Sequence, residues 1–325
     1  MRARATTDRT INRMGVLLLL LTCIFGAAAS NADDRLLLSD QLVGREFTYI
    51  VQPGDSLTAI GARFGVGVNL LAAGNKLAHN ARLKIAQELN IDNRHIVPRA
   101  TDDGIVINIP QRMLYLFREG HALRAYPVAL GKPDWPTPSG RFRIAVKEEN
   151  PVWDVPISIQ EEMRREGKEV KTCVPPGPDN PLGQHWLGLS ISGYGIHGTI
   201  APSSIYQFQT HGCIRLHSDD VAALFPAVET GTPVLLIYRR LLVARIGDRV
   251  FLEVHRDIYG KQPSIEAELK QLAESEILAS WIDWARAGDI IRKQDGIARD
   301  VTQYDSAGLD NGTLRTRSRS LPPRP

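Results

Sequence analysis

Short runs of strand-forming residues, separated by turns rich in glycine and proline, are the feature that most constrains how this chain folds. After residue 103 such runs lie at 105–110, 113–117, 126–130, 141–146, 188–192 and 234–238, and Gly and Pro gather at 131–140 and 175–178. β-branched and aromatic residues favour strands, whereas Gly and Pro favour turns. Residues 104–240 are therefore predicted to form a mostly β domain, with one helix at 218–228.

Residues 47–97 show a different pattern, in which strand and helix periods alternate. Tyr49 and Val51 alternate as in a strand, and Leu57, Ile60 and Phe64 follow at helical spacing. A second short helix is expected to end near residue 75, and strand-forming residues between 83 and 91 close the segment. The order strand, helix, helix, strand predicts a small α+β domain.

The remaining segments are predicted from composition and local pattern. Residues 33–46 are expected to be a linker. Residues 241–304 are expected to form a short α/β extension, with a hairpin at 241–254 that turns at Gly247-Asp248 and a helix at 264–284. Gly, Ser, Thr, Arg and Pro dominate residues 305–325, which predicts a disordered tail.

The first 32 residues have the pattern of a secretory signal. Arginines at positions 2, 4, 9 and 13 precede an apolar run at 16–29, and small residues follow at 27–32. This order predicts export and cleavage after Ala29 or Ala32. An uncleaved membrane anchor is the alternative, although the run is shorter than the ~20 residues that span a bilayer.

Length and charge limit the possible partners. The chain is long enough for two or three domains of roughly 100–200 residues each, and its net charge over 325 residues is only +3. Part of this charge comes from the arginines near both ends. So small a net charge predicts that the chain does not bind nucleic acid.

The residues with reactive side chains gather in two neighbouring segments, 194–199 and 210–216. The first contains His197, and the second contains His211-Gly212-Cys213 and Arg215. A cysteine attacks as its thiolate and needs a nearby base or positive charge, and a histidine beside it supplies a general base. Glycines there let amide N–H groups approach a substrate oxygen, as in an oxyanion hole. The segments together predict a cysteine nucleophile.

The same residues allow two other interpretations. A cysteine in a core is inert, and a histidine beside a glycine is often only part of a turn. His197, His211 and Cys213 are also residue types that bind zinc, but no fourth ligand is evident. We therefore expect no metal.

Together the two segments resemble the signature of L,D-transpeptidases of the YkuD type, in which a histidine precedes a Ser/Thr-His-Gly-Cys motif. Here the motif is Thr210-His211-Gly212-Cys213, and His197 lies 16 positions before Cys213 (213 − 197). The resemblance covers residues 104–240 and implies a YkuD-type β-sandwich. The run 175–183 resembles the Gram-negative, periplasmic branch of the family.

The resemblance implies a role for each matching residue, and these residues are Cys213, His197, Gly198, His211, Gly212 and Arg215. Cys213 is the implied nucleophile and His197 its base, with the ring oriented by a backbone carbonyl at Gly198. The His-Gly-Cys segment shapes the implied oxyanion hole. Arg215 either lines the substrate cleft or bonds to backbone carbonyls that hold the cysteine loop.

The implied reaction is a two-step acyl transfer on peptidoglycan, with no metal or organic cofactor. Cys213 attacks the bond before the terminal D-alanine of a tetrapeptide stem, and an amine then attacks the thioester. The amine belongs to another stem or to an outer-membrane lipoprotein. Water as the acceptor gives carboxypeptidase activity. Carbapenems are implied inhibitors, because they acylate such cysteines.

Residues 47–97 resemble a LysM module, through the opening Tyr49-Ile50-Val51-Gln52-Pro53-Gly54-Asp55-Ser56-Leu57 and through Asn75. LysM modules bind N-acetylglucosamine in glycan strands, and the implied contact residues are Gly54, Asp55, Ser56 and Asn75. Turn formation and helix capping are the alternative roles for these four. Such a module would tether the enzyme to its polymer and raise the local substrate concentration.

Two further classes of protein compete with the transpeptidase. In papain-like hydrolases the cysteine usually precedes its histidine, whereas here His197 precedes Cys213. A non-catalytic wall-binding protein would not need this pair of residues. Cross-linking, lipoprotein attachment and hydrolysis remain open alternatives from the sequence.

Cys173 is the second cysteine that follows the predicted leader. A bridge to Cys213 would need Cα atoms within about 7 Å, and it would block the nucleophile. We therefore expect two free thiols, with Cys173 partly buried beside the cleft.

Overall fold

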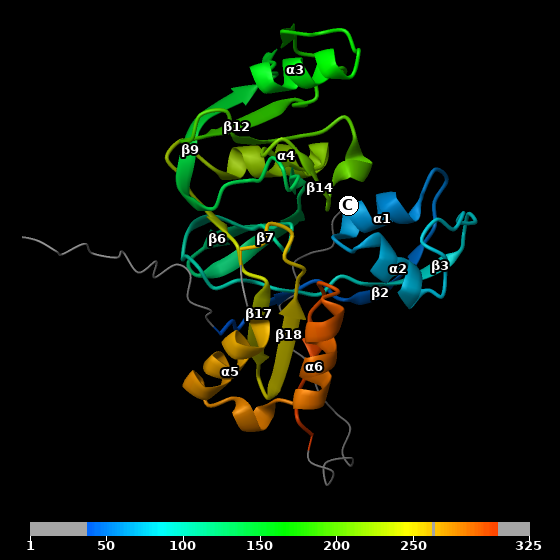
Figure 1. Ribbon diagram of the computed structural model, residues 1–325, viewed down its shortest axis with the longest axis vertical. Coiled ribbons are helices and arrows are strands. Elements are labelled where there is room, and N and C mark those ends of the chain that lie inside the picture. The colour runs from blue at the N-terminus through cyan, green and yellow to red at the C-terminus, as the bar shows by residue number, and fades with distance from the viewer. Residues whose placement is uncertain (1–37, 262–263, 305–325) are drawn as a thin grey trace, which may run out of the picture. The chain divides into compact units, whose positions relative to one another are not determined.

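The computed structural model describes residues 38–261 and 264–304 of the chain (Figure 1). The predicted signal at 1–32 and the predicted tail at 305–325 lie outside these ranges. Among the described residues no single helix is long and apolar enough to cross a membrane, and one bent pair of helices, 57–64 with 68–74, reaches that length and apolarity together.

A mixed sheet of eight strands forms the centre of the domain predicted to be mostly β, in the order β15-β13-β12-β9-β16-β5-β6-β7. Its strands are β5 (Gly104–Asn108), β6 (Met113–Arg118), β7 (His121–Pro127), β9 (Gly140–Glu149), β12 (His185–Leu189), β13 (Gly195–His197), β15 (Ile214–Arg215) and β16 (Pro233–Ile237). β16 runs parallel to β5 and antiparallel to β9. The predicted class, mostly β with few helices, is confirmed.

The central strands of this sheet are buried on both faces. All five residues of β5 are buried. Ile105 and Ile107 belong to the apolar core on one face, while Val106 belongs to a core on the other face that also contains Ala62 and Val97. Because side chains alternate along a strand, the unbroken apolar run in the sequence reflects two cores. The second core is shared with the N-terminal module.

Shorter elements complete this domain. They are β8 (Leu130–Gly131), β10 (Trp153–Asp154), β11 (Cys173–Val174), β14 (Phe208–Thr210), α3 (Ile157–Arg165), α4 (Ser218–Leu224), and the 3₁₀ turns η2 (Pro202–Ser204) and η3 (Phe225–Ala227). β8 pairs with β14, and β10 pairs with β11. The helix predicted at 218–228 therefore ends at Leu224, where Pro226 removes a backbone donor and the chain tightens into η3.

The N-terminal module contains β2 (Glu46–Ile50), α1 (Leu57–Phe64), α2 (Val68–Gly74) and β3 (Glu88–Asp92), in the order predicted from the sequence. Ser56 caps α1 by accepting a hydrogen bond from the amide of Ala59, and Gly65 ends the helix in a left-handed conformation (φ 72°). β2 and β3 pair antiparallel. Their apolar side chains and those of both helices form a core of their own.

Part of the segment predicted to be a linker, 33–46, is integrated into the fold. β1 (Leu42–Val43) pairs with β4 (His95–Ile96). The buried Ser39 forms a bridge with Ala244 and donates its hydroxyl to the carbonyl of Val97 at 2.6 Å. The segment from residue 38 onward therefore lies against both the end of the N-terminal module and the C-terminal extension.

The C-terminal extension begins with the predicted hairpin, β17 (Leu241–Ile246) and β18 (Arg249–Val254). In Figure 1 this hairpin lies between α5 (Ile265–Ser275) and α6 (Trp284–Lys293). The turn η4 (Ala279–Trp281) and the strand β19 (Arg299–Asp300) complete the module. The single helix predicted at 264–284 is wrong, because Ile277 adopts φ 55° after α5 and Asp283 caps a second helix.

A buried carboxylate joins the three modules. Glu253 of β18 is fully buried, and its Oε1 lies 2.8 Å from both His95 Nδ1 and His255 Nε2 and accepts a hydrogen bond from Gln111 at 3.0 Å. Its Oε2 accepts the backbone N–H of Ile96 at 2.6 Å. His95 and Ile96 end the N-terminal module, and Gln111 lies between β5 and β6.

Electrostatics keep this carboxylate ionised. Burial opposes ionisation of Glu253, but the charge of His95 and hydrogen bonds from both histidines lower its pKa from 4.5 to about 2. Burial also opposes protonation of His95, yet Glu253 raises the pKa of that imidazole above 6.5. The pair is therefore charged in mildly acidic solution.

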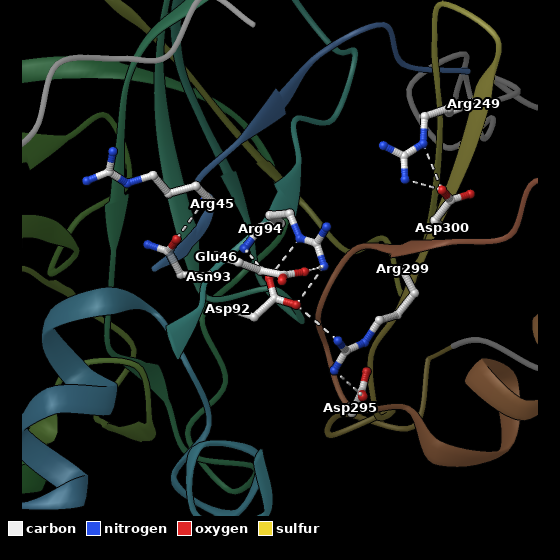
Figure 2. Close-up of polar contacts among 9 residues, drawn as sticks. All are labelled: Arg45, Glu46, Asp92, Asn93, Arg94, Arg249, Asp295, Arg299 and Asp300. Atoms are coloured by element: carbon white, nitrogen blue, oxygen red, sulfur yellow. Dashed lines mark hydrogen bonds and ion pairs between the residues drawn. The ribbon is translucent and has the colours of Figure 1, made fainter. Parts of the chain in front are cut away.

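Salt bridges on the surface add a second connection between the N-terminal module and the extension (Figure 2). Arg94 pairs with Asp92 and with Glu46, while Arg299 joins Asp92 at 3.0 Å to Asp295 at 3.2 Å. Partly exposed ion pairs contribute little singly. Asp92 nevertheless receives arginines from both modules, so the pairs form one network.

We predict that Glu253→Gln lowers the free energy of unfolding by about 3 kcal/mol near pH 5.5, because one partner of a buried ion pair is lost. Glu253 stabilises the fold above its unfolded pKa of 4.5, and this contribution disappears as the pH falls toward 2. His95 stabilises it below its unfolded pKa of 6.5, and this contribution disappears as the pH rises through the raised folded pKa.

Urea unfolding of the wild type and the variant at about pH 5.5 and about pH 9 measures the difference. The loss should be smaller at the higher pH, where a larger fraction of His95 is neutral. Glu274→Gln, at an exposed position of α5, is the matched control and should change little. An equal loss at both pH values would show that charge is not the source.

Candidate active site

Two parallel strands bring the candidate catalytic residues together. β13 pairs with β15 in a register that places His197 opposite Arg215. Residues in register on neighbouring strands project to the same face of a sheet. Cys213 directly precedes β15, two positions before Arg215, so the pairing brings the cysteine loop to the edge of the sheet beside His197.

Threonine side chains fix the loop that carries the cysteine. Thr210 donates its hydroxyl to the Cys213 carbonyl at 2.6 Å and accepts the Gly212 N–H at 3.1 Å, while Thr137 donates to the Gly212 carbonyl at 2.9 Å. Gly212 has φ 104°, and a Cβ atom there would lie 2.6 Å from the ring of Tyr194. Position 212 must therefore be glycine.

Cys213 is a free cysteine that is partly exposed. Its Sγ lies 3.5 Å from the carbonyl oxygen of Gly193 and donates to it. Protein atoms around the thiol raise its pKa above 9.0, although a backbone contact at Gly195 and the charge of Arg215 oppose the shift. At rest Cys213 is therefore a thiol, which would have to lose its proton before it could attack a carbonyl carbon.

His197 is buried and uncharged. Burial and the positive charge of Arg215 lower its pKa from 6.5 to about 3, against the opposing effect of backbone groups at Gly198, Leu182 and Pro181. Its Nδ1 has no hydrogen-bond partner among the described residues. No hydrogen bond to Cys213 is formed in this part of the chain either, and such catalytic bonds often tighten only when substrate binds.

Arg215 lies close enough to influence both catalytic candidates. Its charge favours the thiolate of Cys213 and disfavours protonation of His197. Its Nη1 donates to Ser204 Oγ at 3.0 Å. The guanidinium of Arg215 thus bonds to a side chain of η2, and its predicted place in the substrate cleft stays a prediction.

The side chain of His211 is held by contacts with other side chains, which do not include Cys213. Its Nε2 lies 2.5 Å from Glu162 Oε2 of α3, and the ring of Trp135 meets its imidazole edge-on at 4.3 Å. Lys132 Nζ lies 3.1 Å from the other oxygen of Glu162. The hydrogen bonds from Lys132 and His211 lower the pKa of Glu162 against the effect of burial, so the carboxylate is ionised.

The N-terminal candidates have roles inside their own module. Asp55 Oδ2 accepts from Tyr49 Oη and from the Gln52 N–H, and Ser56 caps α1. Asn75 joins α2 to β3 through its amide, with contacts to the Leu71 carbonyl and to both backbone groups of Asn90. Gly54 has φ 86° in the turn after β2. Glycan contact by these residues stays a prediction.

Cys173 is free, as expected, but it is exposed on β11 opposite Asp154 and is not partly buried. Among the residues that the structure describes, no group of three or more His, Cys, Asp or Glu side chains is placed to hold a metal ion.

Sequence reasoning missed the residues that hold His211. Glu162, Lys132 and Trp135 lie 49 to 79 positions from it. No motif links these positions. The charged helix around Glu162 has the composition of an ordinary solvated surface, and only the fold shows that one of its carboxylates faces the cysteine loop.

Comparisons with known proteins agree with this arrangement. Residues 102–236 match the L,D-transpeptidase catalytic domain of the YkuD family, and residues 49–92 match the LysM domain. The probable L,D-transpeptidase YcfS of Escherichia coli is 33% identical over 228 residues, which cover 68% of this chain and 71% of that protein. The probable L,D-transpeptidase ErfK/SrfK of Salmonella typhimurium is 28% identical over 81% of this chain and 88% of its own length.

A crystal structure of Mycobacterium tuberculosis L,D-transpeptidase 1 is similar with 26% identity and a TM-score of 0.29, over 46% of this chain and 66% of that one. The family assignment rests on the sequence relatives. With a 33% identical relative matched over 71% of its length, and with the YkuD and LysM domains both present, this chain belongs to the L,D-transpeptidase family.

Proposed function

We propose that this chain is a peptidoglycan L,D-transpeptidase in which Cys213 is the acylated nucleophile and His197 the general base. The observation that carries the proposal is the register of β13 and β15, which places His197 beside Arg215 and the cysteine loop. The family membership gives the reaction class, and the LysM domain agrees with a polymeric cell-wall substrate.

The first step is acylation. As Cys213 attacks the carbonyl carbon before the terminal D-alanine, the thiol proton passes to His197, a C–S bond forms, and the C–N bond breaks. The proton then passes from His197 to the departing amine of D-alanine. An imidazole with a pKa of about 3 is neutral before the reaction but is a weak base, so proton transfer must accompany C–S bond formation. Once protonated, His197 gives the proton up readily to the departing amine.

Backbone amides are the candidate oxyanion donors. The sequence assigned this role to the His-Gly-Cys segment, but the Gly212 N–H already donates to Thr210 Oγ1 at 3.1 Å. We therefore assign the role to the Cys213 N–H. Arg215 supports the negative charge of the developing thiolate, since it opposes the rise in the Cys213 pKa.

The second step, deacylation, regenerates the free enzyme. An amine attacks the thioester, His197 takes its proton, and the proton returns to Cys213 as the C–S bond breaks. Another stem peptide as acceptor gives a cross-link, an outer-membrane lipoprotein gives attachment, and water gives carboxypeptidase activity. Mass analysis of the products formed from tetrapeptide disaccharides separates these reactions from one another and from a non-catalytic wall protein.

The site of action follows from the substrate. Peptidoglycan stems lie outside the cytoplasm, so we propose an exported, periplasmic enzyme, in agreement with the predicted signal at 1–32. We propose that the LysM domain holds the enzyme on glycan strands.

Helix α3 is proposed to cover the cysteine loop. No residue of α3 is buried. Glu162, in the middle of the helix, contacts both Lys132 and His211. A helix without an apolar anchor depends on such contacts for its position, so Glu162 is proposed to hold both α3 and the His211 side of the cleft in place.

Replacement of the nucleophile and base tests the mechanism. Cys213→Ala should abolish D-alanine release and thioester formation while the protein stays folded. His197→Ala should lower the acylation rate by about 10²–10⁴-fold, the usual contribution of a general base. Acylation is measured as the mass increase of the intact protein. Normal acylation of the His197 variant would identify His211 as the base.

The pH dependence tests the protonation states. Because the His197 pKa is about 3, the base stays neutral as the pH falls, and acylation should continue without loss from about pH 7 to about pH 5. A histidine with its ordinary pKa of 6.5 would lose most of its base form in this range. A rate that falls tenfold over the range would contradict the neutral, buried base.

The position of α3 can be tested through Glu162. We expect Glu162→Ala to lower kcat/KM for D-alanine release by about tenfold, because His211 and the helix lose their fixed position. Glu161→Ala is the matched control on the same helix, since Glu161 is exposed and should change little. Equal activity of the two variants would exclude a role for Glu162 in the cleft.

A further inference from the structure

A cavity of about 690 Å³ lies where the three modules meet. α1 and α2 supply one wall, the residues just before β14 supply another, and the segments after β18 and after α6 supply the third. Cys213, His197 and Arg215 do not line it. The cavity is therefore separate from the candidate active site, and its volume is within the range of small-ligand pockets, about 300–1,000 Å³.

The charges in this pocket favour an anion. Arg112, Arg256 and Lys293 line it. Within the described residues no ion pair or hydrogen bond engages the side chains of Arg256 and Lys293, and both are exposed. The one acidic lining residue is Asp295: its Oδ2 accepts from Arg299 at 3.2 Å (Figure 2), and its Oδ1 has no hydrogen-bond partner among the described residues. The pocket thus holds an excess of positive charge.

The rest of the lining suits a peptide. On the N-terminal module, the exposed Thr58 and Asn69 present a hydroxyl and a carboxamide, and the partly exposed Leu70 presents apolar surface. These groups match amide groups and short aliphatic side chains. A ligand with carboxylates, amides and methyl groups would therefore contact the basic, polar and apolar side chains of the pocket. A simple anion would contact only the basic side chains.

The pocket is also connected to the cysteine loop. Tyr206 lines it in a left-handed conformation (φ 62°), although its side chain is buried, and the Arg112 guanidinium stacks on its ring at 4.2 Å. Strain of this kind in a bulky residue is typical of functional sites. The lining residues 205–207 lead directly into β14, which His211 follows, so an occupant would contact the chain just before the strand that leads to Cys213.

We propose that this pocket is a second binding site, distinct from the Cys213 cleft, for an acidic peptide such as the carboxylate-bearing stem of a neighbouring peptidoglycan strand. The choice of a stem rests on the proposed function. The pocket would hold one stem while the cleft acylates another, and all three modules would be needed to form it.

The test is calorimetric titration of the full chain carrying Cys213→Ala, which prevents turnover, with the free tetrapeptide stem as the probe. We expect two binding sites per chain. In the same chain, Arg256→Ala with Lys293→Ala should leave one site. Arg124→Ala with Lys270→Ala, which removes two exposed cations elsewhere, is the matched control and should leave two.

Competition identifies the occupant. The peptide-free disaccharide and inorganic phosphate should each fail to displace the stem from the second site. Displacement by the disaccharide would overturn the proposal in favour of a sugar site, and displacement by phosphate at similar concentration would overturn it in favour of a general anion site. An unchanged number of sites in the Arg256/Lys293 variant would also overturn it.

Failure of the proposed function has a different signature. If the chain is not a transpeptidase, the wild type releases no D-alanine from the stem, whatever the titration shows. Turnover by the wild type together with a single stem site in the Cys213→Ala chain would contradict the second site alone.

Discussion

The arrangement of the three modules depends on the ion pairs and hydrogen bonds of the buried Glu253 carboxylate. Its two oxygens accept from groups that belong to the end of the LysM domain, to a turn of the catalytic sheet and to the C-terminal extension. A fully buried charge is costly unless each of its acceptor sites is used. The three modules must therefore be in place together, and the LysM domain cannot act as a freely swinging tether.

Contacts near the candidate catalytic residues also join the LysM domain to the catalytic domain. His217, which follows the cysteine segment, lies 3.1 Å from the Ala62 carbonyl of α1, and Arg63 pairs with Asp219 at 2.7 Å. α1 also packs against η2, whose Ser204 accepts from Arg215. The LysM domain thus touches the elements that position Cys213, so any polymer bound to that domain would have a physical connection to the candidate active site.

Sequence patterns predicted those elements that depend on residues close to one another along the chain. The runs of strand-forming residues identified β5, β6, β9 and β16 and overlapped the ends of β7 and β12, but they did not include β13 or β15. The spacing of Leu57, Ile60 and Phe64 identified α1, and Gly247-Asp248 identified the hairpin turn. The motif around Cys213 brought together residues that the β13–β15 pairing does join. Ser39, Glu253 and Glu162 could not be found in this way, because each depends on at least one hydrogen-bond partner 49 or more positions away.

The lack of any buried residue in α3 has a consequence for access. A helix that contributes nothing to an apolar core can open locally at a small fraction of the free energy needed to unfold the sheet beneath it. Helix α3 can therefore move away and return while the buried residues that flank it, such as Val155, Val174 and Leu182, stay in place. Because α3 is proposed to cover the cysteine loop, its local opening would widen the approach to Cys213 for a bulky polymer.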